Sequence, residues 1–332
     1  MLQSDQRKRV GELYCKVKPV RCHLNFRLFF ISNHFEMKSF LILILVALSI
    51  SCFAQGPKVL VVTAHPDDET GFSVTLFKIT HELNGIVDMA VMTDGGGGFA
   101  DAQLGAMYYH LNLTDSLVAR THLPMIRKQE ILNAGKVLGI RNIYFMEQQD
   151  DYYTTDINPY ISGKNWDIPY IEKRLDQLLA DRQYDFVITM LPHAGQHGHH
   201  KTSVLLALRA VQRFKGTSKP IVLAGNTMLA NATKTDFSIL EGFPETKINI
   251  NTPIFTMNRA YRFKENDKLS YKIVADWVIG EYKSQGAIQE NAIHKADLEI
   301  YRYYDLNESK GITKVQKLFE SLASTGFQPS KN

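Results

Sequence analysis

Cysteine is scarce in this 332-residue chain, and all three cysteines, Cys15, Cys22 and Cys52, lie within the first 54 residues. Residues 55–332 therefore contain no thiol and cannot form a disulfide bond. A metal site in this part of the chain would have to use histidine, aspartate or glutamate side chains as ligands.

A large excess of basic charge is also missing from residues 55–332. The whole chain has 38 Lys and Arg residues against 34 Asp and Glu residues, but eight of the basic and three of the acidic residues belong to the first 54. This leaves 30 basic against 31 acidic residues, a net charge of −1. Proteins that bind nucleic acid usually carry a strong basic patch, so we expect no nucleic acid among the partners.

Long hydrophobic runs are limited to one segment, Phe40–Ala54, which has no charged residue. A membrane-spanning helix needs about 20 apolar residues, so this run is short for a permanent anchor. It follows Lys38 and ends in small residues, which is typical of a secretory signal peptide. We expect a signal peptide at 37–54 and a secreted or periplasmic protein with no permanent membrane span. A lipoprotein acylated at Cys52, or a retained membrane anchor, is the alternative.

Residues 1–36 precede this segment, although signal peptides begin at the N-terminus. We interpret them as a mis-assigned start, with translation beginning at Met37. The alternative is a translated basic extension that makes the hydrophobic run an internal anchor. Residues 55–332 contain no repeat and no low-complexity linker, so we expect them to form a single domain.

Apolar segments of strand length alternate with helical patterns along the first part of this domain. The predicted strands are 58–64, 87–93, 142–146, 184–190 and 220–225, and the predicted helices are 71–85, 124–140, 168–182 and 201–214. This alternation predicts an α/β fold, a Rossmann-like and mostly parallel doubly wound sheet with helices on both faces. Beyond about Asn226 we expect a C-terminal elaboration, with β-like pieces near 246–255 and 260–263 and helices at 271–286 and 312–323.

Polar clusters follow the first and fourth predicted strands. His65, Asp67 and Asp68 come directly after the first strand, and four histidines occur within 193–200 after the fourth. In the commonest doubly wound order these two strands are neighbours, and ligands bind beyond their carboxyl ends. The clusters therefore predict a divalent metal site. Zinc fits best, because catalytic zinc has three protein ligands and an open position; Fe²⁺ could use the same geometry.

Each cluster also has a simpler interpretation when it is taken alone. The carboxylates after the first strand could cap the start of a helix, and the histidines after the fourth could lie in a solvated loop. Their joint placement at the two expected strand ends favours the metal site over either alternative.

The motifs together resemble the PIG-L/LmbE-like family of zinc-dependent N-acetylglucosaminyl deacetylases. The resemblance rests on AHPDDE at 64–69, TDGGG at 93–97, RKQE at 127–130 and HGHHK at 197–201, and it extends more weakly to EYKSQ at 281–285. It implies a Rossmann-like fold and hydrolysis of an acetamide on an amino sugar.

Carried over by position, the resemblance implies that His65, Asp68 and His200 are metal ligands. It makes Asp67 the general base that takes a proton from the attacking water, and His197 the acid or electrostatic helper at the leaving amine.

The chain departs from the family pattern at two places. Many members read His-Pro-Asp-His where residues 197–200 are His-Gly-His-His, so His199 replaces an aspartate that would orient the catalytic histidine. Some members also place a tyrosine just before this motif, where this chain has Ala-Gly-Gln at 194–196. The tuning of catalysis is therefore expected to differ from the family pattern.

Weaker signals concern possible substrate contacts. Asp94 and the four glycines after it could approach a sugar or a phosphate, or form a flexible loop. Arg127 could contact substrate or lie on a solvated helix face. The segment Asp150–Asp156 and Trp166 could stack on a sugar or serve only in loops and packing.

These observations predict a metal-dependent hydrolase that removes an acetyl group from a small-molecule or glycan substrate, an N-acetylated amino sugar of the GlcNAc type or a related amide. Two alternatives from other classes are a non-catalytic sugar-binding protein on the same scaffold and another metal hydrolase, such as a phosphoesterase.

Overall fold

The structure is a computed structural model that describes residues 56–231, 237–264, 268–290 and 295–326. The predicted extension at 1–36 and the predicted signal peptide at 37–54 lie outside these residues and stay predictions. Within the described ranges, no helix has both the length and the apolar character needed to cross a membrane.

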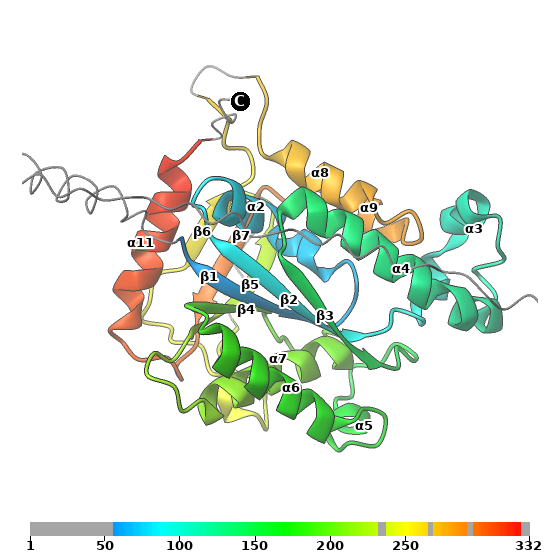
Figure 1. The fold of residues 1–332 in the computed structure, drawn as a ribbon, viewed down its shortest axis with the longest axis horizontal. Helices are drawn as coiled ribbons and strands as arrows, with labels where there is room; N and C mark the ends of the chain where they lie inside the picture. The colour runs from blue at the N-terminus through cyan, green and yellow to red at the C-terminus, as the bar shows by residue number, and fades with distance from the viewer. Residues whose placement is uncertain (1–55, 232–236, 265–267, 291–294, 327–332) are drawn as a thin grey trace, which may run out of the picture. The chain divides into compact units, whose positions relative to one another are not determined.

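One sheet of seven strands runs through the described part of the chain, in the order β3–β2–β1–β4–β5–β7–β6 (Figure 1). The strands are β1 (Lys58–Thr63), β2 (Ile86–Thr93), β3 (Asn142–Gln148), β4 (Phe186–Met190), β5 (Ile221–Met228), β6 (Phe255–Asn258) and β7 (Leu298–Tyr303). The first five pair in parallel, whereas β7 runs antiparallel to both β5 and β6. The predicted mostly parallel, Rossmann-like sheet is confirmed, and β1 and β4 are neighbours as expected.

Helices cover both faces of the sheet (Figure 1). One face packs against α2 (Ser73–His81), α4 (Ser116–Leu138), α8 (Lys272–Gly280) and α11 (Gly311–Ser324), and the other against α5 (Asn158–Ile161), α6 (Ile168–Arg182) and α7 (Gly198–Arg213). Shorter elements are η1 (Asp68–Phe72), η2 (Gly98–Asp101), α3 (Gln103–Tyr109), η3 (Pro244–Thr246) and α9 (Ala287–Glu290).

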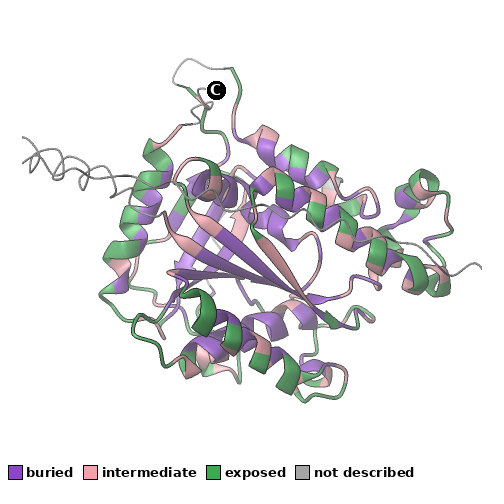
Figure 2. Ribbon diagram, viewed as in Figure 1, coloured by how far each residue is buried: buried purple, intermediate pink, exposed green. Residues whose placement is uncertain are grey.

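The central strand β1 shows why the sequence forms a two-faced core. Val59 and Val61 pack into the core beneath α2, whereas Leu60 and Val62 pack into the core beneath α7. Successive residues of a strand face opposite sides, so a strand buried on both sides needs an unbroken apolar run. Figure 2 shows this burial concentrated on the strands and on the helix faces turned towards them.

Helix α4 corrects one predicted boundary. The sequence suggested a start near Pro124, but the helix begins at Ser116, where the Asp115 side chain accepts hydrogen bonds from the backbone N–H groups of Leu117 and Val118. Pro124 therefore lies inside the helix. The end is close to expectation, because Gly139 adopts a left-handed φ of 67° and closes the last turn.

The C-terminal elaboration differs more from expectation. The β-like piece predicted at 246–255 forms a strand only from Phe255 onwards, with an isolated bridge at Ile248, and the piece at 260–263 contributes a single bridge at Arg262. The strand β7, which the sequence pattern did not indicate, lies between β5 and β6.

A candidate metal and catalytic site at the carboxyl edge of the sheet

Two chain segments from distant parts of the sequence meet beyond the carboxyl ends of β1 and β4. The first runs from His65 into η1, directly after β1. The second is the start of α7, where His197 is the N-cap and its Nδ1 accepts a hydrogen bond from the His199 backbone N–H at 3.0 Å. The parallel pairing of β1 and β4 therefore brings the two predicted clusters to one place.

His65, Asp68 and His200 form one close group in this site. His65 Nδ1 lies 2.9 Å from His200 Nε2, which lies 3.1 Å from Asp68 Oδ1. The other carboxylate oxygen of Asp68 accepts hydrogen bonds from the backbone N–H groups of Ala64 and His65 at 2.9 and 2.8 Å. Backbone donors thus fix this carboxylate so that Oδ1 faces the imidazoles.

The donor set of this group fits a divalent ion. One ligand atom from each residue lies within 4.8 Å of the other two. Tetrahedral zinc with bonds of about 2.0–2.1 Å keeps its ligand atoms about 3.3 Å apart, close to the observed separations. Two imidazoles and one carboxylate are also the ligand types that leave an open position in catalytic zinc sites.

Asp67 lies beside this group in a strained conformation. Its φ of 126° is unusual for a residue other than glycine, and such strain costs about 1–3 kcal/mol. Arg127 donates to Asp67 Oδ2 at 2.8 Å and to the carbonyl of Pro66, and Glu69 Oε2 accepts the Asp67 backbone N–H at 3.2 Å. These contacts hold the Asp67 carboxylate in place. Arg127 is buried, not on a solvated helix face.

The two adjacent aspartates differ in their pKa. Burial raises the pKa of Asp67 to about 7, although the Arg127 guanidinium acts against this rise. Burial also opposes ionisation of Asp68, but His200 and His65 outweigh it and hold the pKa of Asp68 well below its usual value. Asp68 is therefore suited to remain an anionic ligand, whereas Asp67 can exchange a proton near neutral pH.

The histidines are affected by burial in different degrees. Burial lowers the pKa of His65, but the carboxylates of Asp150 and Asp68 outweigh it, and the net shift is upward. Burial and the neighbouring imidazoles lower the pKa of His197 to about 3, and they lower the pKa of His199 still further. His197 and His199 are therefore neutral imidazoles at physiological pH.

The loop after β3 supplies two carboxylates that the sequence reasoning treated as ordinary loop residues. Asp151 Oδ1 lies 3.0 Å from His199 Nε2, and Asp150 Oδ1 lies 3.5 Å from His199 Nδ1 and 3.7 Å from His65 Nε2. Their position directly after a strand is the signal that could have identified them, because β3 ends at the same edge as β1 and β4.

Asp94 lies in the same edge and organises the glycine-rich loop. Its Oδ1 accepts hydrogen bonds from the backbone N–H groups of Gly96 and Asp150, at 2.8 and 3.2 Å. Arg127 donates to the carbonyl of Gly95 from the other side. Substrate contacts by Asp94 and Arg127 stay predictions; in the structure both residues shape the loops around the site.

Two aromatic residues singled out from the sequence occupy different environments. Trp166 is buried and donates from Nε1 to the carbonyl of Gln149. Tyr153 is 68% exposed, yet its ring lies edge-on to His197 with 4.9 Å between ring centroids, and its hydroxyl donates to the carbonyl of Gly195. Tyr153 therefore presents an aromatic surface beside the site.

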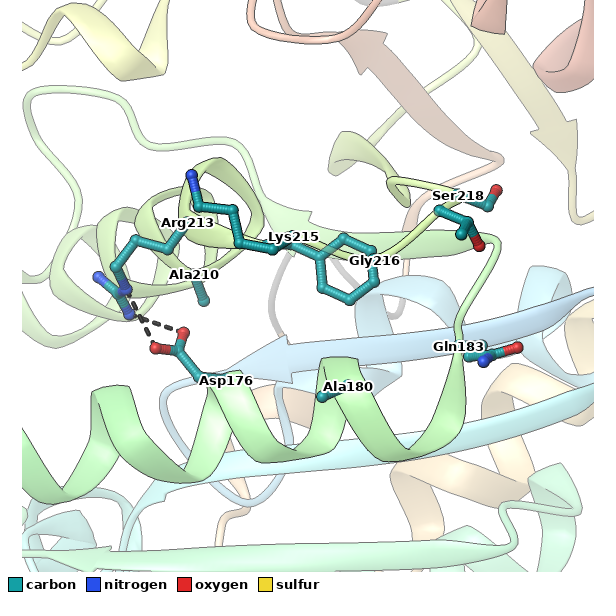
Figure 3. Close-up of a pocket in the computed structure, with 10 residues that line it drawn as sticks. Asp176, Ala180, Gln183, Ala210, Arg213, Lys215, Gly216 and Ser218 are labelled. Atoms are coloured by element: carbon teal, nitrogen blue, oxygen red, sulfur yellow. Dashed lines mark hydrogen bonds and ion pairs between the residues drawn. The ribbon is translucent and has the colours of Figure 1, made fainter.

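A separate pocket of about 290 Å³ lies away from this site (Figure 3). It is lined by the C-terminal turns of α6 and α7 and by the segment before β5, which belong to the amino edge of the sheet. Figure 3 shows one ion pair in its lining, in which Arg213 donates to Asp176 at 2.9 and 3.1 Å. The pocket contains none of the predicted site residues.

This chain is similar to known proteins in both sequence and fold. Residues 60–211 match the family model described as PIG-L, GlcNAc-PI de-N-acetylase. The chain is 27% identical over 170 residues to a probable N-acetyl-alpha-D-glucosaminyl L-malate deacetylase 2 of Bacillus subtilis, covering 49% of this chain and 64% of that protein. It is 24% identical over 168 residues to the protein of the same name from Bacillus cereus, covering 50% and 66%.

A solved structure shows the same fold at lower identity. The A40926 pseudoaglycone deacetylase Dbv21 is 12% identical, with a TM-score of 0.50, over 75% of this chain and 97% of that chain. The chain spans just under two thirds of the length of the two curated relatives. The family match over residues 60–211 confirms the resemblance to PIG-L/LmbE-like deacetylases that the motifs indicated.

Proposed function

We propose that this protein is a metal-dependent deacetylase that hydrolyses the acetamide of an N-acetylated amino sugar. The observation that carries the proposal is the convergence of His65, Asp68 and His200 within ligand distance of one another, with the Asp67 carboxylate held beside them by Arg127. Both curated relatives are named as probable deacetylases of N-acetyl-alpha-D-glucosaminyl L-malate, which supports an N-acetylated glucosamine derivative as the substrate class.

His65, Asp68 and His200 would hold the metal, and zinc suits two imidazoles and a carboxylate better than Mg²⁺ or Ca²⁺, which prefer all-oxygen sites. When bound there, zinc would supply a Lewis acid that polarises the acetyl carbonyl and lowers the pKa of a water molecule. Fe²⁺ is the alternative ion for the same ligands.

Asp67 is the proposed general base. Arg127 binds its Oδ2, so Oδ1 can take the proton from the attacking water. A pKa of about 7 suits this role, because a general base works best when its pKa lies near the operating pH.

His197 is the proposed electrostatic helper, a hydrogen-bond donor to the reacting acetamide. Its Nδ1 accepts the His199 backbone N–H, so the proton of the neutral ring lies on Nε2. The ring can therefore donate a hydrogen bond from Nε2 to the developing oxyanion or to the leaving nitrogen.

The two aspartates provide the experiment that tests this function. Acetate release from a panel of N-acetylated amino sugars and glycans is measured for the wild type, Asp67→Asn and Asp68→Ala at matched zinc content. We expect Asp67→Asn to keep near-normal zinc and to lose activity by roughly 10²–10⁴-fold, the usual value of general-base catalysis. We expect Asp68→Ala to lose zinc and activity together.

The contrary outcomes separate the alternatives. Full activity of Asp67→Asn would place the base elsewhere, with His197 as the first candidate. A wild-type protein that binds N-acetylated sugars and releases no acetate from any of them would favour the sugar-binding alternative.

A further inference from the structure

A line of three side chains leads from the proposed metal position into the protein interior. His65 faces His200 and Asp68 with its Nδ1, and its Nε2 lies 3.0 Å from His199 Nδ1. His199 Nε2 lies 3.0 Å from Asp151 Oδ1. Each imidazole in the line therefore has a short contact at both of its nitrogens.

The chemistry of these groups fixes the direction of the hydrogen bonds. An ionised carboxylate only accepts, so His199 must donate from Nε2 to Asp151. The neutral ring of His199 then has its lone pair at Nδ1 and accepts a hydrogen bond from His65 Nε2. With its proton on Nε2, a neutral His65 directs the lone pair of Nδ1 towards Asp68 and His200.

The line is anchored at its inner end and shielded from water. Asp151 accepts hydrogen bonds from Tyr160 Oη and Asn165 Nδ2, both at 2.7 Å. His199 is fully buried, and its ring packs against Tyr160 and Trp166, with centroid separations of 4.3 and 5.1 Å. In such an environment an imidazole cannot turn its ring without losing two hydrogen bonds.

We propose that Asp151 and His199 are positioning residues that lock His65 in the tautomer whose Nδ1 binds the metal. This inference rests on the proposed metal-dependent function. It assigns a role to the histidine that replaces the family's aspartate at position 199. Ligating histidines are commonly oriented by a partner at their second nitrogen; here the partner is another histidine, and the loop after β3 supplies the carboxylate behind it.

Zinc affinity provides the first test, measured without substrate by competition with a chelating dye. Loss of such an outer partner typically costs 10–100-fold in metal affinity. We expect this loss for Asp151→Asn, which keeps the volume of the side chain, and for His199→Phe, which keeps the aromatic packing. His193→Phe, at an exposed histidine of the loop before α7, is the matched control and should bind zinc as the wild type does.

The tautomer of His65 provides the second test. If Asp151 and His199 served only to stabilise the fold, they would not determine which nitrogen of His65 carries the proton. In the zinc-loaded, ¹⁵N-histidine-labelled protein, proton–nitrogen correlation spectra should show His65 protonated on Nε2, with its signals assigned by their loss in His65→Asn. Ligation through Nε2, with an ion between His65, His197 and His199, would overturn the inference.

The two proposals can fail separately. Unchanged zinc affinity in a folded Asp151→Asn protein would overturn the positioning role while leaving the metal site and the deacetylase function standing. A wild-type protein that binds no zinc or Fe²⁺ would overturn the proposed function and this inference with it. Thermal unfolding of the metal-free variants identifies those that are folded, and Asp151→Asn remains the deciding variant if His199→Phe unfolds.

Discussion

Neighbouring residues acquire different chemistry in this site because their surroundings differ. Asp67 and Asp68 are adjacent carboxylates, yet backbone donors and His200 stabilise the charge of Asp68, whereas burial raises the pKa of Asp67. Paired carboxylates with separated pKa values are a common way to obtain one anionic ligand and one group that exchanges a proton. The division of roles is therefore a property of position and not of residue type.

Tyr153 is the residue for which we predict an effect on substrate binding. Its exposed ring beside His197 can contact a sugar ring, and aromatic contacts are worth about 0.5–1.5 kcal/mol. Tyr153→Ala should therefore raise KM by about 2- to 13-fold with little change in kcat. Tyr152→Ala is the matched control, because Tyr152 is similarly exposed at 61%. Steady-state kinetics on an N-acetylated substrate decide this, and an equal effect of both variants would contradict it.

At the scale of elements, strand β7 stabilises the helix that follows the site. Phe72, the N-cap residue of α2, has no side-chain oxygen that could accept a hydrogen bond from the first turn of the helix. Glu299 on β7 does this instead and accepts the backbone N–H groups of Val74 and Thr75, both at 2.9 Å. Arg259 donates to the same carboxylate, and both charged side chains are fully buried. The antiparallel strand thus caps a helix from a distant part of the chain.

We predict that Glu299→Gln destabilises the protein strongly. The change removes the carboxylate charge from the buried ion pair with Arg259, and breaking a buried ion pair costs about 3–5 kcal/mol. Asp297→Asn, at the partly exposed pair with Lys272, is the control and should cost about 1 kcal/mol or less. Denaturant unfolding measures both changes. A loss below about 1 kcal/mol for Glu299→Gln would show that the pair contributes little.

Elements that follow simple periodicity could be predicted from the sequence, and β7 could not. The helix predicted at 168–182 has the observed bounds, and the first four strands lie within two residues of theirs. Strand β7 is buried at five of its six positions and carries Glu299 and Arg302 among them, so neither an apolar run nor an alternating pattern appears. Buried charges that are satisfied by distant residues leave no local signal.

In the site, too, some contacts could be predicted from the sequence and others could not. His65, Asp68 and His200 come together because parallel neighbours place their carboxyl ends at one edge, which the strand order makes predictable. The contact of Asp151 with His199 depends on the path of the loop after β3. A stretch of polar loop residues contains no periodicity that specifies such a path.

At the scale of the whole described domain, the two edges of the sheet carry different kinds of polar cluster. The carboxyl edge carries the candidate site. Near the amino edge, the buried Asp88 of β2 accepts hydrogen bonds from Arg141 and Asn142 at the start of β3 and from Tyr184 before β4. This cluster connects three strand regions and lies apart from the site residues, so changes in it should affect stability and leave the chemistry intact.

Asp88 therefore provides a prediction about pH and stability. Burial opposes its ionisation, but Arg141, Tyr184 and Asn142 outweigh burial and lower the pKa of Asp88. A carboxyl group with a depressed folded pKa stabilises the protein above its unfolded pKa of about 3.9, and this contribution is lost as the pH falls through the folded pKa. Asp88→Asn should lower the free energy of unfolding by roughly 1–3 kcal/mol at pH 7.

The difference between the wild type and Asp88→Asn should shrink as the pH falls below about 4, because the wild-type carboxyl group then becomes protonated and loses the same interaction. Urea unfolding at pH 7, 5 and 3 measures this convergence, and Asp305→Asn, at the exposed pair with Lys247, serves as the control with little change at any pH. If the difference in the free energy of unfolding between the wild type and Asp88→Asn stays constant from pH 7 to pH 3, the shape of the Asp88 side chain and not its charge determines its contribution to stability. Deacetylation by Asp88→Asn at neutral pH, measured where the variant is folded, should equal that of the wild type, because the site lies at the other edge of the sheet.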